Sequence, residues 1–542
     1  MKQAYGLLVS SGLIFLTSAA GSFLAQAQSN PLIRPTNYGE IEGIAVESRF
    51  GDEIIHTYAW LGIPYAQAPV GELRWKAPRA PEKWEGIKQT KEFGSSCTQF
   101  GGLMSIMNCE DVGKLIGGES CLYLNIWRPA TEQEGLPVFF WIHGGGNTVG
   151  QAAMSLYHGA NFAGKTNLVF VSLNYRLGPL GWFALPALRT GEALDDSGNF
   201  GTLDIIQALT WVKQNIAFFG GDPNHVTIAG ESAGGVNVYS LLASPLAAGL
   251  FHQAISQSGA PFFTDLESGE ERAEKVLHQL LINDGHANSP EGAQRFLRDQ
   301  EKAWIAAYLR SKSAEEIFAC YEKGTFGTVN GSSQLFVDGT VLVMSPGKSL
   351  KSGDYHQVPF LAGNNKEEAK LFLPLMIGDI AEVSLCRMIQ DIDPDHPQVK
   401  LSDYLSPLDR VIYNPIGRLS GIGFQFVGVD VPAKRMARHQ EGIYAYRFDW
   451  DEEPAPLDYV IGAGHGVEIA FVFGNFQADP DSVLRFAWSE ANRGGRLELS
   501  ERMMTYWANF ARTGNPNGAG LPEWKPYSKR PGAPKRILLD AE

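Results

Sequence analysis

One serine sits among small residues in the segment GESAG at 230–234, directly after the apolar run HVTIAG. A GxSxG pattern between a strand and a helix is typical of a nucleophile elbow, in which a sharp turn lifts the hydroxyl of Ser232 out of the top of a sheet. The chemistry that such a serine could perform is acyl transfer, provided that a base, an acid and oxyanion donors surround it. A tight turn without a catalytic role can have the same sequence, so the presence of a base, an acid and oxyanion donors must distinguish the two.

Backbone donors for an oxyanion are expected at two places. The segment WIHGGGNTVG at 141–150 puts three glycines, 144–146, straight after a buried strand, where the missing side chains leave backbone N–H groups accessible. The N–H of Ala233, next to the serine, would supply the other donor at the start of a helix, where the helix dipole also favours negative charge.

The base and the acid must follow the serine along the chain in the order serine, acid, histidine. His465 in GAGHGVEIAFVFG is flanked by glycines on a loop that comes after a strand, which suits a base aimed across the top of a sheet. The segment LAGNNKEEAKLF at 361–372 also follows a strand and offers Glu367 and Glu368 as the acid. The residues alone do not choose between these two glutamates.

Alternating strands and helices are needed to hold these groups together. Continuous apolar runs of strand length predict a mostly parallel sheet buried on both faces, and the strands occupy 136–143, 167–175, 225–230, 358–363 and 442–450. Helices are predicted at 203–221 and 232–244. Residues from about 265 to 350 and from 366 to 440 are typical of helices and loops inserted over a site. The predicted class is therefore α/β, with a doubly wound sheet.

The composition bounds the class of protein further. The chain has 542 residues, of which 44% are hydrophobic, and it contains no repeat or Ser/Gly linker, so one large domain over 28–542 is predicted. The formal net charge is −14 and no long basic run occurs. Phosphate contacts need clustered Lys and Arg, so a nucleic-acid partner is not expected.

The N-terminus is typical of a secretory signal. Lys2 precedes an uncharged, mostly apolar stretch, and Ala25-Gln26-Ala27 fits a small-residue cleavage site. We expect residues 1–27 to be removed after Ala27, which would place the protein in the periplasm or outside the cell without a stable membrane anchor. The alternative is an uncleaved anchor, since residues 5–27 are long enough to span a bilayer.

Motifs along nearly the whole chain resemble the type B carboxylesterases, a family of the α/β-hydrolase fold that includes bacterial para-nitrobenzyl esterases and animal cholinesterases. The similar segments are GIPYAQAPVGELRWKAP (62–78), ESCLYLNIW (119–127), HGGG (143–146), NYRLGPLGW (174–182), FFGGDPNHVTIAGESAGG (218–235), NNKEEA (364–369), GHGVEIAFVFG (464–474) and WANFARTGNPN (507–517). The resemblance implies a central, mostly parallel sheet flanked by helices, with helical insertions over the active site.

The resemblance also assigns roles. It implies Ser232 as the nucleophile, His465 as the general base and Glu368, rather than Glu367, as the orienting acid. The implied oxyanion donors are the N–H groups of Gly145, Gly146 and Ala233, and Glu231 matches a family glutamate that modulates the site. No metal ion and no cofactor are implied.

The cysteines and the family's variable positions add further expectations. By resemblance, Cys97 pairs with Cys121, and Cys109 then lies inside that loop without a family partner. The chain has five cysteines, so at least one thiol is free or pairs between molecules. The loop lacks the tryptophan with which cholinesterases bind choline, so choline esters are not expected substrates. Asn147 stands where many relatives carry an apolar residue, which argues against a purely apolar acyl pocket.

These observations predict a secreted serine carboxylesterase that hydrolyses small-molecule esters through an acyl-enzyme and acts as a monomer or small homo-oligomer. Its activity is expected to fall as the pH drops through a histidine pKa of about 6 to 7. A lipase or an amidase with the same triad is an alternative, because the fold does not name the substrate. A binding protein on an inactive esterase fold is a further alternative, although every catalytic group is retained.

Overall fold

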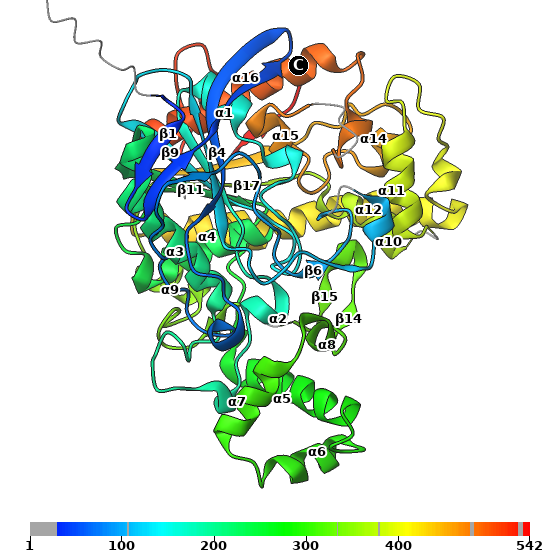
Figure 1. Cartoon of the computed structure of the whole chain (residues 1–542). Helices are drawn as coiled ribbons and strands as arrows, with labels where there is room; N and C mark the ends of the chain where they lie inside the picture. Colours follow the sequence, from blue (N-terminus) through cyan, green and yellow to red (C-terminus); the bar gives the residue numbers. More distant parts are fainter. Residues whose placement is uncertain are drawn as a thin grey trace, which may run out of the picture.

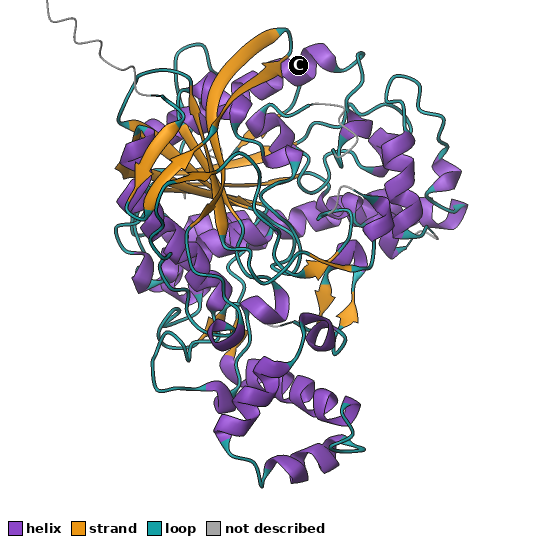
Figure 2. Ribbon diagram, in the orientation of Figure 1, coloured by secondary structure: helices purple, strands orange, loops and turns teal. Residues whose placement is uncertain are grey.

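The structure is a computed structural model, and it describes residues 30–105, 108–332, 334–377, 380–476, 482–528 and 535–541. The predicted signal segment and its cleavage site at Ala27 lie outside these residues. A ten-stranded sheet forms the centre, and helices cover it on both faces (Figures 1 and 2). This arrangement confirms the predicted α/β class.

Seven neighbouring strands of the central sheet are parallel, and three antiparallel strands extend one side. The parallel strands, in spatial order, are β19 (Ile537–Leu539), β18 (Ile443–Phe448), β17 (Phe360–Asn365), β12 (Gln253–Gln257), β11 (Gly221–Glu231), β9 (Leu136–Ile142) and β10 (Val169–Leu173). The antiparallel extension is β8 (Tyr123–Pro129), β4 (Glu53–Pro64) and β3 (Ile44–Phe50). Each predicted strand is therefore present, with its ends shifted by a few residues.

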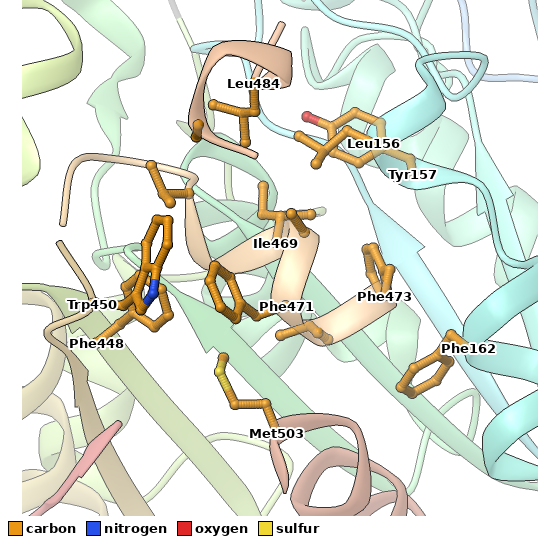
Figure 3. Packing of buried hydrophobic residues seen from close by; sticks show 14 of the residues in the cluster. Leu156, Tyr157, Phe162, Phe448, Trp450, Ile469, Phe471, Phe473, Leu484 and Met503 are labelled. Carbon is orange, nitrogen blue, oxygen red and sulfur yellow. The ribbon is translucent and has the colours of Figure 1, made fainter. Parts of the chain in front are cut away.

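The core lies on both faces of this sheet because side chains of each strand alternate between them. On β9, Phe139 and Trp141 join one buried cluster, whereas Val138, Phe140 and Ile142 join the other. The first cluster packs against α1 (Ala160–Thr166), α15 (Glu468–Phe473) and α16 (Arg493–Thr513), and Figure 3 shows part of it around Phe471 and Phe473. The second packs against α3 (Phe200–Asn215), α4 (Ala233–Ala243) and α9 (Pro346–Ser352).

One predicted helix is shorter than expected. The sequence pattern predicts a helix over 203–221, but α3 ends at Asn215 and a 3-10 turn, η5 (Ile216–Phe219), follows it. Gly220 then adopts a left-handed conformation with φ 78°, which closes the turn and lets β11 begin at Gly221.

Smaller elements and insertions surround the sheet. One inserted group contains α5 (Leu266–Asn283), α6 (Pro290–Leu297), α7 (Lys302–Ser311) and α8 (Ala314–Phe318), and Figure 1 shows α5, α6 and α7 standing away from the sheet. The other contains α10 (Leu373–Met376), α11 (Glu382–Asp391), α12 (Pro407–Phe424) and α13 (Val431–Met436), and α14 (Leu457–Val460) comes after β18. Further short elements include the helix α2 (Gly178–Gly181) and a three-stranded sheet of β1 (Ile33–Thr36), β2 (Gly39–Glu42) and β5 (Ile87–Gln89). Three two-stranded sheets pair β6 (Gln99–Phe100) with β7 (Leu115–Ile116), β13 (Thr264–Asp265) with β16 (Phe336–Val337), and β14 (Glu322–Lys323) with β15 (Val329–Asn330).

None of the helices described by the structure has the length and apolarity needed to cross a bilayer.

The described residues contain two disulfide bonds, and one of them joins the second insertion to the rest of the chain. Cys97 is bonded to Cys121, as the resemblance implies. Cys109, expected to lack a family partner, is bonded to Cys386 on α11, 277 residues further along the chain. Cys320 is the free thiol among the described residues.

Candidate active site

Ser232 lies at the tip of a strained turn between β11 and α4. Its φ of 56° and ψ of −120° fall in a region that non-glycine residues rarely adopt, which costs of order 1–3 kcal/mol. The turn is held by a hydrogen bond of 2.8 Å from the N–H of Ser232 to the carbonyl of Gln257 on β12. A Cβ on Gly234 would lie only 2.0 Å from the carbonyl oxygen of Ile142, so the helix can approach β9 only with glycine there. The half-buried hydroxyl is thus presented at the carboxyl end of the central strands.

His465 is on the loop between α14 and α15 and is 2% exposed. Its Nδ1 lies 2.5 Å from Oε2 of Glu368 in a hydrogen bond. The rings of Phe372 and Phe424 pack against the imidazole, with ring centroids 5.2 Å and 5.8 Å from it. Packing and the carboxylate together fix the ring orientation, and they leave Nε2 to face the serine turn.

Glu368, and not Glu367, meets the histidine. Glu368 opens the turn that follows β17, and its Oε1 accepts hydrogen bonds of 2.7 Å from the Ser258 hydroxyl and from the N–H of Asn365. The side chain of Glu367 points elsewhere, where its Oε2 forms a buried ion pair of 2.8 Å with Nζ of Lys370. The glutamate that contacts the histidine is the one that the resemblance implies as the acid, and its catalytic role stays a prediction.

Two more buried carboxyl groups surround the imidazole. Oε1 of Glu231 lies 3.0 Å from Nε2 of His465, although the two are not aligned for a hydrogen bond. Glu468 accepts hydrogen bonds from Gln257 (3.1 Å) and from Asn365 (2.6 Å). The sequence analysis did not single out Glu468, although it lies only three residues after His465 in the same motif.

This concentration of carboxyl groups controls the protonation of the site. Burial raises the pKa of Glu231 to about 8, because the charged form loses its hydration. Burial alone would lower the pKa of His465, but the charges of Glu231 and Glu368 outweigh it and raise that pKa to about 10. The expectation from the sequence, a pKa of about 6 to 7 for His465, took no account of the Glu231 carboxylate beside Nε2.

The hydrogen bond between serine and histidine is not formed in this structure. Among the residues that the structure describes, the Ser232 hydroxyl has no hydrogen bond to His465, and Nε2 faces the Glu231 carboxylate instead. Ser232 directly follows Glu231, so the imidazole and the hydroxyl belong to the same small region. In unliganded enzymes such catalytic hydrogen bonds are often long or poorly aligned and tighten when substrate binds.

In the glycine loop after β9, contacts hold the carbonyl groups in place and thereby set the direction of the N–H groups. The Gly144 carbonyl lies 2.9 Å from Nδ1 of His143, and the Gly145 carbonyl accepts from the N–H groups of Thr148 (3.1 Å) and Val149 (3.0 Å). A peptide N–H points opposite to its C=O, so the N–H groups of Gly145 and Gly146 point away from these contacts. Within the described part of the chain, neither of them has a hydrogen-bond partner.

The three expected oxyanion donors lie around the serine turn. A Cβ on Gly144 would be 3.1 Å from Cβ of Ser232, which shows how closely the glycine loop approaches the nucleophile turn. Ala233 opens α4, so its N–H precedes the first helical hydrogen bond. These unpaired N–H groups are of the kind that stabilises a tetrahedral oxyanion.

Asn147 directly follows the glycine loop, and its side chain forms hydrogen bonds with neighbouring side chains. It is fully buried with φ 55°, and its Oδ1 accepts hydrogen bonds from Asn237 (2.8 Å) and from the Tyr175 hydroxyl (3.2 Å). Its Nδ2 donates to Gln334 at 3.1 Å. The amide of Asn147 is therefore engaged by neighbouring side chains of the protein.

A deep apolar pocket opens beside His465 and Glu231. Its empty volume, mouth included, is about 930 Å³. The lining residues are Leu103, Met104, Met154, Leu156, Tyr157, Glu231, Phe326, Leu371, Pro374, Leu385, Met388, Ile389, Ile392, Tyr404, Leu457, Val460, Ile461, His465, Gly466, Ile469, Val483, Leu484 and Phe486. Four of them, Leu156, Tyr157, Ile469 and Leu484, lie near one another at the top of Figure 3.

Comparisons with known proteins identify the family of the chain. The family model "Carboxylesterase family" matches residues 30–403 and 412–541. The chain is 32% identical to a para-nitrobenzyl esterase of Bacillus subtilis over 94% of each chain, and 34% identical to a cocaine esterase of Homo sapiens over 91% of this chain and 85% of that one. A solved PNB esterase structure superposes with a TM-score of 0.70 at 30% identity, covering 95% of this chain and 96% of that chain.

A second solved structure gives the same result. A carboxylesterase of Geobacillus stearothermophilus superposes with a TM-score of 0.67 at 31% identity, covering 94% of this chain and 96% of that chain. These matches confirm the α/β-hydrolase fold and extend over nearly the whole chain. The protein therefore belongs to the carboxylesterase family and is a carboxylic-ester hydrolase.

Proposed function

We propose that this esterase works through an acyl-enzyme on Ser232, with His465 as the general base and Glu368 as the group that orients it. The observation that carries the proposal is the buried 2.5 Å contact between Glu368 and His465, at the same edge of the sheet as the strained serine turn. The partly exposed hydroxyl, the histidine and the carboxylate supply the three groups that acyl transfer needs.

The reaction follows from these positions. As the Ser232 oxygen attacks the ester carbonyl, Nε2 of His465 takes its proton, and the Glu368 carboxylate stabilises the resulting imidazolium through Nδ1. The N–H groups of Gly145, Gly146 and Ala233 hold the oxyanion, each such donor being worth about 3 kcal/mol. His465 then returns the proton to the departing alcohol, and a water molecule hydrolyses the acyl-enzyme by the same steps.

Trapping the nucleophile tests this proposal. A fluorophosphonate should inactivate the protein with one equivalent bound, because the tetrahedral phosphorus adduct on the serine resembles the tetrahedral intermediate of the proposed reaction. Peptide mapping by mass spectrometry is expected to find the adduct on Ser232. An adduct on another serine, or inactivation without any adduct, would refute the assignment.

The pH dependence should reveal the carboxylate beside Nε2. The base must be neutral, so kcat/KM falls as the pH drops through the pKa of His465, and the raised pKa puts that fall above the usual histidine value of 6.5. In Glu231→Gln the carboxylate beside Nε2 is gone, so the acid limb of the pH–rate profile should move to lower pH by about 1 to 3 units.

A matched variant controls the pH experiment. Glu441→Gln removes one exposed carboxylate that no hydrogen bond or ion pair links to the site, and its profile should coincide with that of the unmodified protein. A limb in Glu231→Gln that stays in place, or moves to higher pH, contradicts the role given to Glu231.

Export from the cytoplasm is part of the proposal. Two disulfide bonds in the described residues suit an oxidising compartment, and the N-terminal residues have the composition of a signal segment. Cleavage after Ala27 would leave Gln28 as the first residue of the mature protein, and N-terminal sequencing distinguishes this from an uncleaved chain.

A further inference from the structure

The pocket beside His465 has one polar end, and the rest of its wall is almost entirely apolar. Among the described lining residues, the charged or titratable groups near neutral pH are His465 and Glu231, and both lie at the reactive end. Apart from the hydroxyls of Tyr157 and Tyr404, the remaining lining side chains are aliphatic, aromatic or thioether groups. None of them is tryptophan, lysine or arginine. Such a wall stabilises a hydrocarbon group and disfavours a cation.

The position of the pocket indicates which half of an ester it receives. In the proposed mechanism His465 hands a proton to the departing alcohol, so the alcohol portion must lie on the imidazole side of the reacting carbon. His465, Gly466 and Glu231 line the pocket, whereas Gly145 and Gly146 do not. The pocket is therefore placed for the alcohol portion of the substrate.

Helix α11 forms one side of the wall that the second insertion contributes, beside Leu371, Pro374 and Tyr404. Leu385, Met388 and Ile389 on α11 and Ile392 at its end all line the pocket. Their spacing of three, four and seven residues puts them on one face of the helix. The exposed Arg387 lies on a different face and does not line the pocket. The depth of the pocket thus depends on where α11 is held.

Two links hold α11 against other parts of the same wall. The Cys109–Cys386 disulfide ties the helix to the loop closed by Cys97 and Cys121. One turn earlier on the helix is Glu382, whose carboxylate bridges two separate segments.

The Glu382 bridge reaches residues that themselves line the pocket. Its Oε1 accepts a hydrogen bond of 2.9 Å from the N–H of Leu103, and its Oε2 accepts one of 3.0 Å from the N–H of Phe326. The ring of Phe326 packs edge-on against Phe372, with centroids 5.5 Å apart, and Phe372 packs on His465. Three distant segments are thereby fixed into one wall that continues to the catalytic histidine.

From these contacts we infer that α11, fastened by Cys109–Cys386 and by Glu382, is the specificity-determining wall of the alcohol pocket, and that the preferred substrates are esters of long, uncharged hydrocarbon alcohols. This inference rests on the proposed function, because it assigns the pocket through the proton that His465 gives to the alcohol. Leu385, Met388 and Ile389 are specificity residues in this scheme, and Glu382 and the disulfide are positioning groups.

A series of acetate esters tests the wall directly. Methyl, butyl and octyl acetate share one acyl group and differ only in the alcohol, and kcat/KM should rise with alcohol length in the unmodified protein. In Met388→Trp a larger side chain fills the pocket, so the octyl-to-methyl ratio of kcat/KM should fall at least about tenfold. The matched variant Arg387→Trp puts the same residue outside the pocket and should keep the original ratio.

The fastening is tested by removing the cross-link. The double variant Cys109→Ser/Cys386→Ser should also lower the octyl-to-methyl ratio, because α11 is no longer held in place, and Cys320→Ser, which removes the free thiol, should not. Acetylcholine and its neutral carbon isostere, 3,3-dimethylbutyl acetate, test the charge preference. The neutral ester is expected to have the higher kcat/KM by at least about tenfold.

The outcomes separate this inference from the proposed function. An unchanged octyl-to-methyl ratio in Met388→Trp overturns α11 as the wall, and an unchanged ratio in the double variant overturns the role of the disulfide. Equal rates for the charged and neutral esters overturn the preference for uncharged alcohols. The Met388→Trp result stands even where the double variant does not fold. Phosphonate labelling away from Ser232 would instead remove the proposed function itself.

Discussion

Replacing Ser232 with alanine is expected to lower kcat for a short-chain chromogenic ester by about 10⁴- to 10⁶-fold, with the folded state intact. The alanine keeps the turn but removes the only atom that can form the acyl-enzyme, so only water attack aided by the oxyanion donors remains. The melting temperature should not fall, because Ser232 occupies a strained backbone conformation and its hydroxyl makes no hydrogen bond to another described residue. Ester hydrolysis at saturating substrate and thermal unfolding measure the two effects.

A second serine on the same helix provides the control. Ser240 is fully buried and its hydroxyl donates a hydrogen bond of 2.7 Å to the carbonyl of Asn237. Ser240→Ala should leave kcat within a small factor and reduce stability by about 1 kcal/mol. Appreciable turnover by Ser232→Ala, at a tenth of the original rate or more, would show that another nucleophile carries the reaction.

Replacing the two adjacent glutamates by glutamine, one at a time, should affect activity in one case and stability in the other. Glu368→Gln is expected to lower kcat about 10³- to 10⁴-fold, because an amide at this position no longer stabilises the imidazolium and can select the wrong tautomer. Glu367→Gln should leave kcat nearly unchanged. It should instead lower the free energy of unfolding by about 3–5 kcal/mol, because Lys370 would remain buried without its partner charge.

The two variants control each other, since they make the same chemical change at neighbouring positions. Steady-state kinetics and denaturant unfolding give kcat and the free energy of unfolding for each variant. Which variant loses kcat and which loses stability matters more than the size of either change. A large loss of kcat in Glu367→Gln without a loss of stability would mean that Glu367, and not Glu368, orients the histidine.

Local sequence patterns were sufficient for the parts of the site that depend on nearby residues. The nucleophile turn needs small residues within a few positions of Ser232, and the glycine loop needs its glycines beside β9, so both are visible in a short window. The strands were predictable for the same reason, because burial on both faces of a parallel sheet requires uninterrupted apolar runs. His465 was recognisable from its glycine loop and from its order in the chain.

Other parts of the site required the fold. Glu367 and Glu368 have the same chemistry, and only the path of the chain after β17 turns one toward His465 and the other toward Lys370. The carboxylate of Glu231 beside Nε2, and hence the raised pKa of the histidine, depends on how β11 meets the loop before α15. Charge interactions of this kind act over a few ångströms in space, which sequence distance does not report.

By itself, the sequence determined the class of fold and the family resemblance, and it predicted Ser232 as the nucleophile and His465 as the base, because each of these is encoded by residues close together along the chain. Only the tertiary structure showed the contact between Glu368 and His465, the bond between Cys109 and Cys386, and the apolar wall that α11 forms beside the histidine. Cysteines 277 residues apart carry no mutual signal, and their bond forms because folding brings the loop and the helix to the same side of one pocket.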